Sequence, residues 1–91
     1  MRVRISGRVQ GVGFRYFTRH EARSLNVTGY VRNTSDGSVE AELVGQIEGV
    51  DRMLERVARG PALARVLEVK QLLREPAGPE PDTPGDFEIR A

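Results

Sequence analysis

Two hydrophobic periods alternate along this chain of 91 residues, and their order limits the folds that it can adopt. Residues 2 to 9 alternate apolar or small side chains with polar ones, and this period of two predicts a strand with one buried face. From Phe14 the period becomes helical, which predicts a helix over about 15 to 25. The expected apolar stripe of this helix is Phe14, Phe17, Ala22 and Leu25.

The same succession of periods follows in the second half of the chain. Strands are expected at 28 to 33 and at 39 to 43, because the sequence TSDG between them is typical of a hairpin turn. A second helix is expected over about 46 to 58, since the sequence GP at 60 and 61 ends its pattern. The expected apolar stripe of this helix is Ile47, Val50, Leu54 and Val57.

Two further strands complete the predicted set of elements. In the first, Leu67 and Val69 alternate with charged residues and are expected on the core face. A proline-rich connection at 75 to 85 leads to a short closing strand near 87 to 89. The order strand, helix, strand, strand, helix, strand is the ferredoxin-like plan. We therefore expect one α+β domain over residues 1 to 91. Two helices would cover one face of an antiparallel sheet, the other face would stay charged and wet, and the last strand would lie at the edge.

Charge and composition argue against several classes of partner. The 14 basic and 13 acidic residues leave a net charge of +1 with the signs interleaved, so no broad positive field is available for a nucleic acid. An RNA-binding sheet would also need aromatic side chains on its central strands, where Val39, Ala41 and Leu43 stand instead. There is no cysteine and no apolar run near the roughly 20 residues of a membrane span. The expectation is a cytoplasmic monomer without a nucleic-acid partner, a membrane partner or a metal.

The sequence GRVQGVGFR, residues 7 to 15, joins the first strand to the first helix. Peptide N–H groups at the start of a helix lack internal partners, and the helix dipole places partial positive charge there. Gly11 and Gly13 allow the backbone to curve until several of these N–H groups converge. The loop therefore predicts a site for a phosphate-sized anion. Its residues are Gln10, Gly11, Val12, Gly13 and Phe14.

Arg15 follows this loop and adds a permanent charge, whose planar fork can hold two phosphate oxygens at once. The alternative is that the glycines only make a tight turn and that Arg15 is a solvated helix residue. The glycine spacing matches neither a Walker loop nor the dinucleotide fingerprint, which disfavours nucleoside triphosphates and nicotinamide cofactors.

Asn33 is the second candidate for the site. If the first helix is a crossover, the strands before and after it run in the same direction, so Asn33 and the glycine loop emerge at the same edge of the sheet. The amide of Asn33 carries both a donor and an acceptor, which suits holding a water molecule in a fixed orientation. The alternative is a turn-forming residue beside TSDG.

The segments GRVQGVGFR and GYVRNTSDGSVEAELVG resemble, in this order, the two signature segments of the acylphosphatase family. The resemblance is strong over residues 3 to about 45, looser through GP at 60 and 61, and reaches FEIR near the end. It implies a ferredoxin-like fold and hydrolysis of the carboxyl-phosphate bond of acyl phosphates to carboxylate and inorganic phosphate. It also implies that no metal or organic cofactor is needed.

The resemblance further implies roles for particular residues. Arg15 corresponds to the phosphate-binding arginine of the family, Asn33 to the asparagine that positions the attacking water, and the amides of 10 to 15 to the phosphate cradle. The chain departs from the family at Ala91, where similar members carry an aromatic residue. We expect this departure to affect the packing of the edge strand and to have little bearing on the site.

The chemistry expected of such a site needs few groups. Because a carboxylate is a good leaving group, no strong general acid is required, and the family resemblance implies that the phosphoryl oxygens of the substrate accept the proton of the water. His20 lies off the apolar stripe and away from the loop, so we expect it to be solvated. Two alternatives are a non-catalytic module that binds an anion or metabolite, and a relative of the acylphosphatase-like module of larger carbamoyl-transferring maturation proteins, for whose partner domains this chain has no room.

Overall fold

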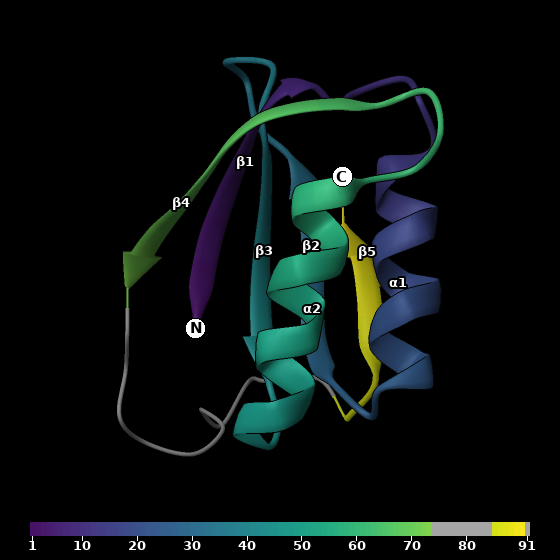
Figure 1. Cartoon of the computed structure of the whole chain (residues 1–91), viewed down its shortest axis with the longest axis vertical. Helices are drawn as coiled ribbons and strands as arrows, with labels where there is room; N and C mark the ends of the chain where they lie inside the picture. Colours follow the sequence, from purple (N-terminus) through teal and green to yellow (C-terminus); the bar gives the residue numbers. More distant parts are fainter. Residues whose placement is uncertain (74–84, 91) are drawn as a thin grey trace.

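The computed structural model of the chain describes residues 1–73 and 85–90, which form two helices and five strands in the predicted order (Figure 1). The bounds of the first five elements differ from the predicted bounds by at most one residue. Most of the proline-rich connection predicted at 75 to 85 lies outside the described residues. The elements are β1 (Arg2–Arg8), α1 (Phe14–Ser24), β2 (Thr28–Asn33), β3 (Val39–Val44), α2 (Ile47–Arg59), β4 (Arg65–Leu73) and β5 (Phe87–Arg90).

The strands form one sheet in the order β4-β1-β3-β2-β5. β1 pairs antiparallel with β3 and β4, and β2 pairs antiparallel with β3, as the ferredoxin-like plan requires. β5 lies at the edge, as predicted, but it is parallel to β2, so the expectation of a wholly antiparallel sheet is wrong. The reason is topological. β4 runs opposite to β2, so β4 ends at the level of the sheet where β2 begins. A strand that starts again from this level runs in the same direction as β2.

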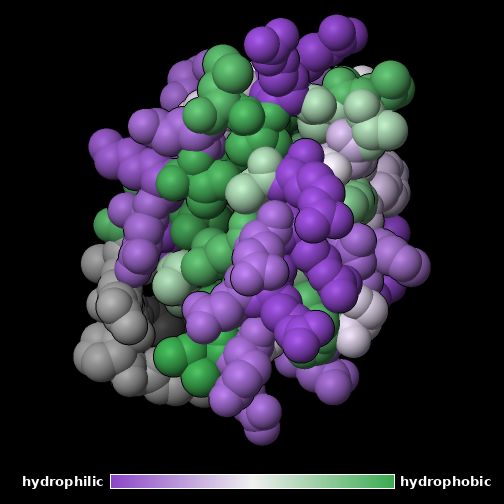
Figure 2. Space-filling view, viewed as in Figure 1, coloured by the Kyte–Doolittle hydropathy of each residue, from purple (hydrophilic) through white to green (hydrophobic). Residues whose placement is uncertain are grey.

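Both helices cover the same face of the sheet, and the core lies between the two layers (Figure 1). Burial of each large apolar side chain contributes roughly 1.5 to 3 kcal/mol to folding. Figure 2 shows that the outward side of α2 is hydrophilic, whereas apolar surface lies between α2 and β4. The largest fully buried side chains are Phe14, Phe87, Ile5, Leu43 and Met53.

The core faces of the helices differ in part from the predicted stripes. In α1, Thr18 is fully buried and Phe17 only partly so. The hydroxyl of Thr18 donates to the carbonyl oxygen of Phe14 at 2.8 Å, which satisfies this polar group inside the core. In α2, Met53 is fully buried, whereas Ile47 is 64% exposed because it is the first residue of the helix and lies beyond the edge of the core.

A bulge in β4 overturns the expectation that Leu67 faces the core. Ser6 of β1 lies opposite Glu68, and Gly7 lies opposite Val66, so Leu67 is an extra residue on β4. Leu67 is 72% exposed, while Val66 packs against the core. A strict period of two cannot reveal an inserted residue, which is why the sequence pattern placed Leu67 on the wrong face.

Gly7 lies beside this bulge, and its replacement by alanine is expected to lower the free energy of unfolding by roughly 2 to 4 kcal/mol. Its φ is +124°, and an added Cβ would lie 2.1 Å from the carbonyl oxygen of Arg65 in β4. Gly37 is the matched control, because its φ is +91° but an added Cβ would meet no atom within 4 Å. Urea denaturation of both variants measures the difference. Equal losses for Gly7→Ala and Gly37→Ala would show that the close approach of β4 has no energetic weight.

The face of the sheet opposite the helices is charged, as expected, but part of it is closed to water. Glu40 is buried there, and its carboxylate accepts hydrogen bonds from the Tyr30 hydroxyl at 3.3 Å and from Arg32 at 3.2 Å. The Arg90 guanidinium lies 4.2 Å from the centre of the Tyr30 ring. Burial, more than any charge, raises the pKa of Tyr30 above its usual value. These contacts join β5 to the middle of the sheet.

Candidate active site

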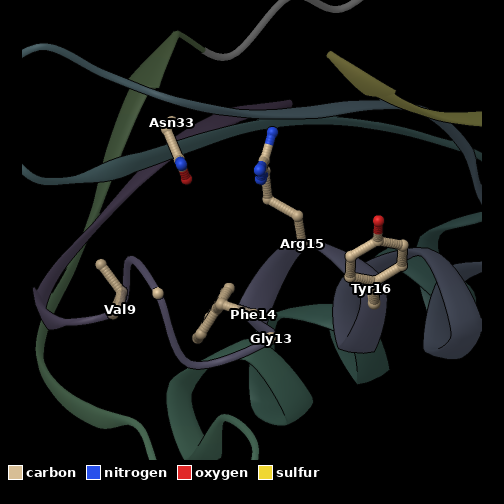
Figure 3. A pocket seen from close by; sticks show the side chains of 7 residues that line it. Val9, Gly13, Phe14, Arg15, Tyr16 and Asn33 are labelled. Atoms are coloured by element: carbon tan, nitrogen blue, oxygen red, sulfur yellow. The ribbon is translucent and has the colours of Figure 1, made fainter. Parts of the chain in front are cut away.

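A cavity of about 180 Å³ lies where the loop after β1 enters α1 and where β2 ends (Figure 3). β1 and β2 are both antiparallel to β3, so they run in the same direction and deliver their following residues to one edge of the sheet. The prediction that Asn33 and the glycine loop emerge together is therefore confirmed. The cavity is lined by Val9, Gly11, Gly13, Phe14, Arg15, Tyr16 and Asn33.

The glycine loop beside this cavity carries peptide N–H groups that make no hydrogen bond within the described residues. Gly11 and Gly13 have φ values of +74° and +77°, and Gly13 is the N-cap of α1. An added Cβ would meet no atom within 4 Å at either position, so glycine is required by the conformation and not by lack of space. Within residues 1–73 and 85–90, the amides of residues 11–15 donate to no protein acceptor. These amides are therefore available as donors near the positive end of the helix dipole.

Arg15, in the first turn of α1, directs its side chain toward the same space as Asn33 (Figure 3). Its Nη1 donates to the carbonyl oxygen of Arg90 at 3.0 Å. No carboxylate in the described part of the chain forms an ion pair with Arg15, so its charge is available to an anion. This contact joins the first turn of α1 to β5 and restricts the orientation of the Arg15 side chain.

β5 is held against α1 at both of its ends. Beyond the contact of Arg15 with Arg90, the guanidinium of Arg23 donates to both carboxylate oxygens of Asp86, at 3.1 and 2.8 Å. This interaction with Arg23 is the main cause that lowers the pKa of Asp86. The edge strand contacts the site, because the carbonyl oxygen of Arg90 in β5 accepts the hydrogen bond from Arg15. Ala91 itself lies outside the described residues.

Asn33 is the last residue of β2, opposite Val39 of β3. Its side chain points into the cavity (Figure 3) and, among the described residues, has no hydrogen-bond partner. The following turn is closed by other groups, since the backbone N–H of Thr34 donates to the carbonyl oxygen of Ser38 at 2.9 Å. The amide of Asn33 is therefore not used to form the turn, and it is free to bind a small polar molecule.

Gln10 has a part in the site that the sequence did not indicate. Its Nε2 donates to the carbonyl oxygens of Thr34 and Ser38, both at 2.8 Å. The side chain thus ties the glycine loop to the turn that follows Asn33, which fixes the distance between the two halves of the site. Of the five predicted loop residues, Gln10 and Val12 are not among those that line the cavity.

Comparison with known proteins identifies the family of this chain. A family model described as Acylphosphatase matches residues 1–89. The chain belongs to the acylphosphatase family. The acylphosphatase of Rhizobium etli is 56% identical to it over 80 residues, which are 84% of this chain and 85% of that protein. The crystal structure of acylphosphatase from Bacillus subtilis is similar with a TM-score of 0.81 and 31% identity, over 99% of this chain and 96% of that one.

Membership of the acylphosphatase family assigns the activity. The chain is a hydrolase that converts acyl phosphates to a carboxylate and inorganic phosphate. The same fold also occurs within a larger protein, since the crystal structure of HypF from T. kodakarensis is similar with a TM-score of 0.80 and 28% identity. That match covers 99% of this chain but 11% of HypF, whereas the Rhizobium etli enzyme is matched over 85% of its length.

The turn after β2, which follows Asn33 of this acylphosphatase, has its own hydrogen bonds. The Asp36 carboxylate accepts hydrogen bonds from the Thr34 hydroxyl and from the backbone N–H of Ser38. The bond from Thr34 is the largest cause that lowers the pKa of Asp36. Because the folded pKa lies below the unfolded one, the stabilisation by Asp36 is present above the unfolded pKa and is lost as the pH falls through the folded pKa. These hydrogen bonds to the Asp36 carboxylate therefore contribute to the turn at neutral pH and are weakened in acid.

Other groups in this acylphosphatase lie away from the cavity. His20 is exposed on α1, as predicted. No group of three or more His, Asp or Glu side chains that could hold a metal ion is found among residues 1–73 and 85–90. In the same part of the chain, no helix is long and apolar enough to span a membrane.

Proposed function

We propose that the phosphoryl group of an acyl phosphate binds in the cavity described above, held by the amides of residues 11–15 and by Arg15, while Asn33 holds the attacking water. One observation supports this most strongly. Judged by residues 1–73 and 85–90, the cavity combines amides without an acceptor, an arginine without a carboxylate partner and an asparagine whose side-chain amide makes no hydrogen bond. Each of these groups would gain a partner when a phosphoryl group and a water molecule enter.

The proposed reaction is an in-line displacement at phosphorus. The oxygen of the water forms a bond to phosphorus while the bond from phosphorus to the acyl oxygen breaks, and the electron pair of that bond leaves with the carboxylate. The proton of the water passes to a phosphoryl oxygen, so no protein base is required. Such a reaction depends mainly on positioning and on neutralisation of the phosphoryl charge. Asn33 supplies the first contribution, and Arg15 with the amides supplies the second.

Apolar residues behind the site strengthen these polar contacts. Val9 and Phe14 line the cavity, and both are 1% exposed. Their side chains keep water away from one side of a bound phosphoryl group and lower the local dielectric constant. Charge interactions are stronger in such surroundings than in bulk water. Arg15 is thus placed where its charge has more effect than on an open surface.

The test is the loss of benzoyl phosphate absorbance with purified protein in the presence of EDTA. We expect turnover that EDTA does not reduce, because the proposed mechanism uses no metal and no organic cofactor. Turnover that disappears with EDTA and returns with a divalent cation would contradict the mechanism. Binding of inorganic phosphate without any turnover would instead indicate an anion-binding module.

The proposal includes a monomeric enzyme in the cytoplasm. Size-exclusion chromatography at assay concentration tests the monomer, and cell fractionation tests the location.

A further inference from the structure

An aromatic side chain stands at the mouth of the cavity without an assigned role. Tyr16 lines the cavity, yet 65% of its surface is exposed. Its hydroxyl has no hydrogen-bond partner within the described residues. The Arg19 guanidinium lies 5.4 Å from the centre of the ring, one turn further along α1. The contact with Arg19 restricts the ring from one side and leaves other parts of it open.

The position of Tyr16 relative to Asn33 suggests what the ring could contact. In Figure 3 the Arg15 side chain lies between those of Asn33 and Tyr16, and all three residues line the cavity. In an in-line displacement, the attacking water and the leaving group are on opposite sides of the phosphorus. If Asn33 holds the water, the acyl group points away from Asn33 and toward the side of the cavity that Tyr16 borders.

We propose that Tyr16 forms the wall of an acyl-group subsite that favours aryl and other large apolar acyl phosphates over acetyl phosphate. This rests on the proposed roles of Arg15 and Asn33. A ring exposed beside the reacting centre can bury apolar surface against an aryl or branched acyl group, and aromatic rings gain further from offset or edge-to-face contact. An acetyl group is too short to cover the ring.

The experiment compares kcat/KM for benzoyl phosphate with kcat/KM for acetyl phosphate in the same preparations. In Tyr16→Ala we expect the ratio of the two values to fall by about 3- to 10-fold, which is the range that a lost aromatic contact supports. Tyr16→Phe should keep the ratio, because the ring and not the hydroxyl makes the contact. The inhibition constant of inorganic phosphate, which carries no acyl group, should be the same in all three proteins.

The outcomes separate this inference from the proposed function. A wild-type protein that hydrolyses neither substrate would refute the function, whereas normal turnover with an unchanged ratio in Tyr16→Ala would refute the subsite alone. Equal losses with both substrates would also overturn it, because they would show an effect on the phosphoryl site. His20→Ala is the matched control, since His20 is exposed on the same helix and does not line the cavity. Its ratio should equal that of the wild type.

Discussion

Replacement of Arg15 by alanine is expected to lower kcat/KM for benzoyl phosphate by at least about 1,000-fold. The guanidinium is the one full positive charge among the residues that line the cavity, and its fork can contact two phosphoryl oxygens. The inhibition constant of inorganic phosphate should rise by about 10- to 100-fold, because charge-assisted hydrogen bonds to the ground state are lost as well. Steady-state kinetics with phosphate as the competing ligand measures both quantities.

Two controls make the result for Arg15 specific. Arg15→Lys keeps the charge without the planar fork, so we expect it to retain phosphate binding better than Arg15→Ala but to recover little of kcat. His20→Ala changes an exposed residue of the same helix and should behave as the wild type. If Arg15→Ala kept its affinity for phosphate, the anion would be held by the backbone amides alone, and the role assigned to the guanidinium would be wrong.

Replacement of Asn33 by alanine is expected to lower kcat by about 100- to 1,000-fold while the inhibition constant of inorganic phosphate stays within about twofold of the wild-type value. The physical reason is that Asn33 contacts the water and not the anion. Its side chain makes no hydrogen bond within the described residues, so the change should leave the fold intact. Urea denaturation of Asn33→Ala checks this.

A different outcome would reassign Asn33. A large rise in the phosphate inhibition constant would show that the side chain binds the anion, and a small effect on kcat would show that the water is positioned by another group. Gln10→Ala offers a comparison, because Gln10 ties the loop to the turn after Asn33 without lining the cavity. We expect Gln10→Ala to change both kcat and the inhibition constant of inorganic phosphate, since both halves of the site would shift.

The local sequence pattern predicted the helices and strands well. It predicted less well which side chains point into the core. Element bounds were predicted to within one residue for the first five elements, because the signals that mark them are local. These signals are the turn at TSDG, the sequence GP after α2 and the change of period at Phe14. Leu67 was misplaced because a bulge depends on how β4 meets β1, and β4 is 57 or more residues away from β1 in the sequence. Met53 was missed because the stripe was extended from Ile47, which lies outside the core.

The cavity likewise has features that the sequence could predict and features that it could not. Gly11, Gly13 and Arg15 lie within one loop and first helical turn, so their closeness could be predicted from the local sequence. The parallel direction of β1 and β2 was enough to predict that Asn33 lies beside them. The support of the site was not predictable, because Gln10 and Arg15 each donate to backbone carbonyl groups of distant elements. Such acceptors exist at every residue, and no sequence pattern marks the ones that are used.

The hydrogen bond from Arg15 to the carbonyl oxygen of Arg90 joins residues 75 positions apart. Closing so long a loop is entropically costly, and contacts of this kind form late in folding. A chain in which β1 to β4 had already assembled would hold most of its core, but Arg15 would lack the acceptor that orients it. During refolding, enzymatic activity should therefore return only when the edge strand docks, after the helical signal has recovered. Recovery of enzymatic activity would then measure the docking of the last strand and not only the formation of the core.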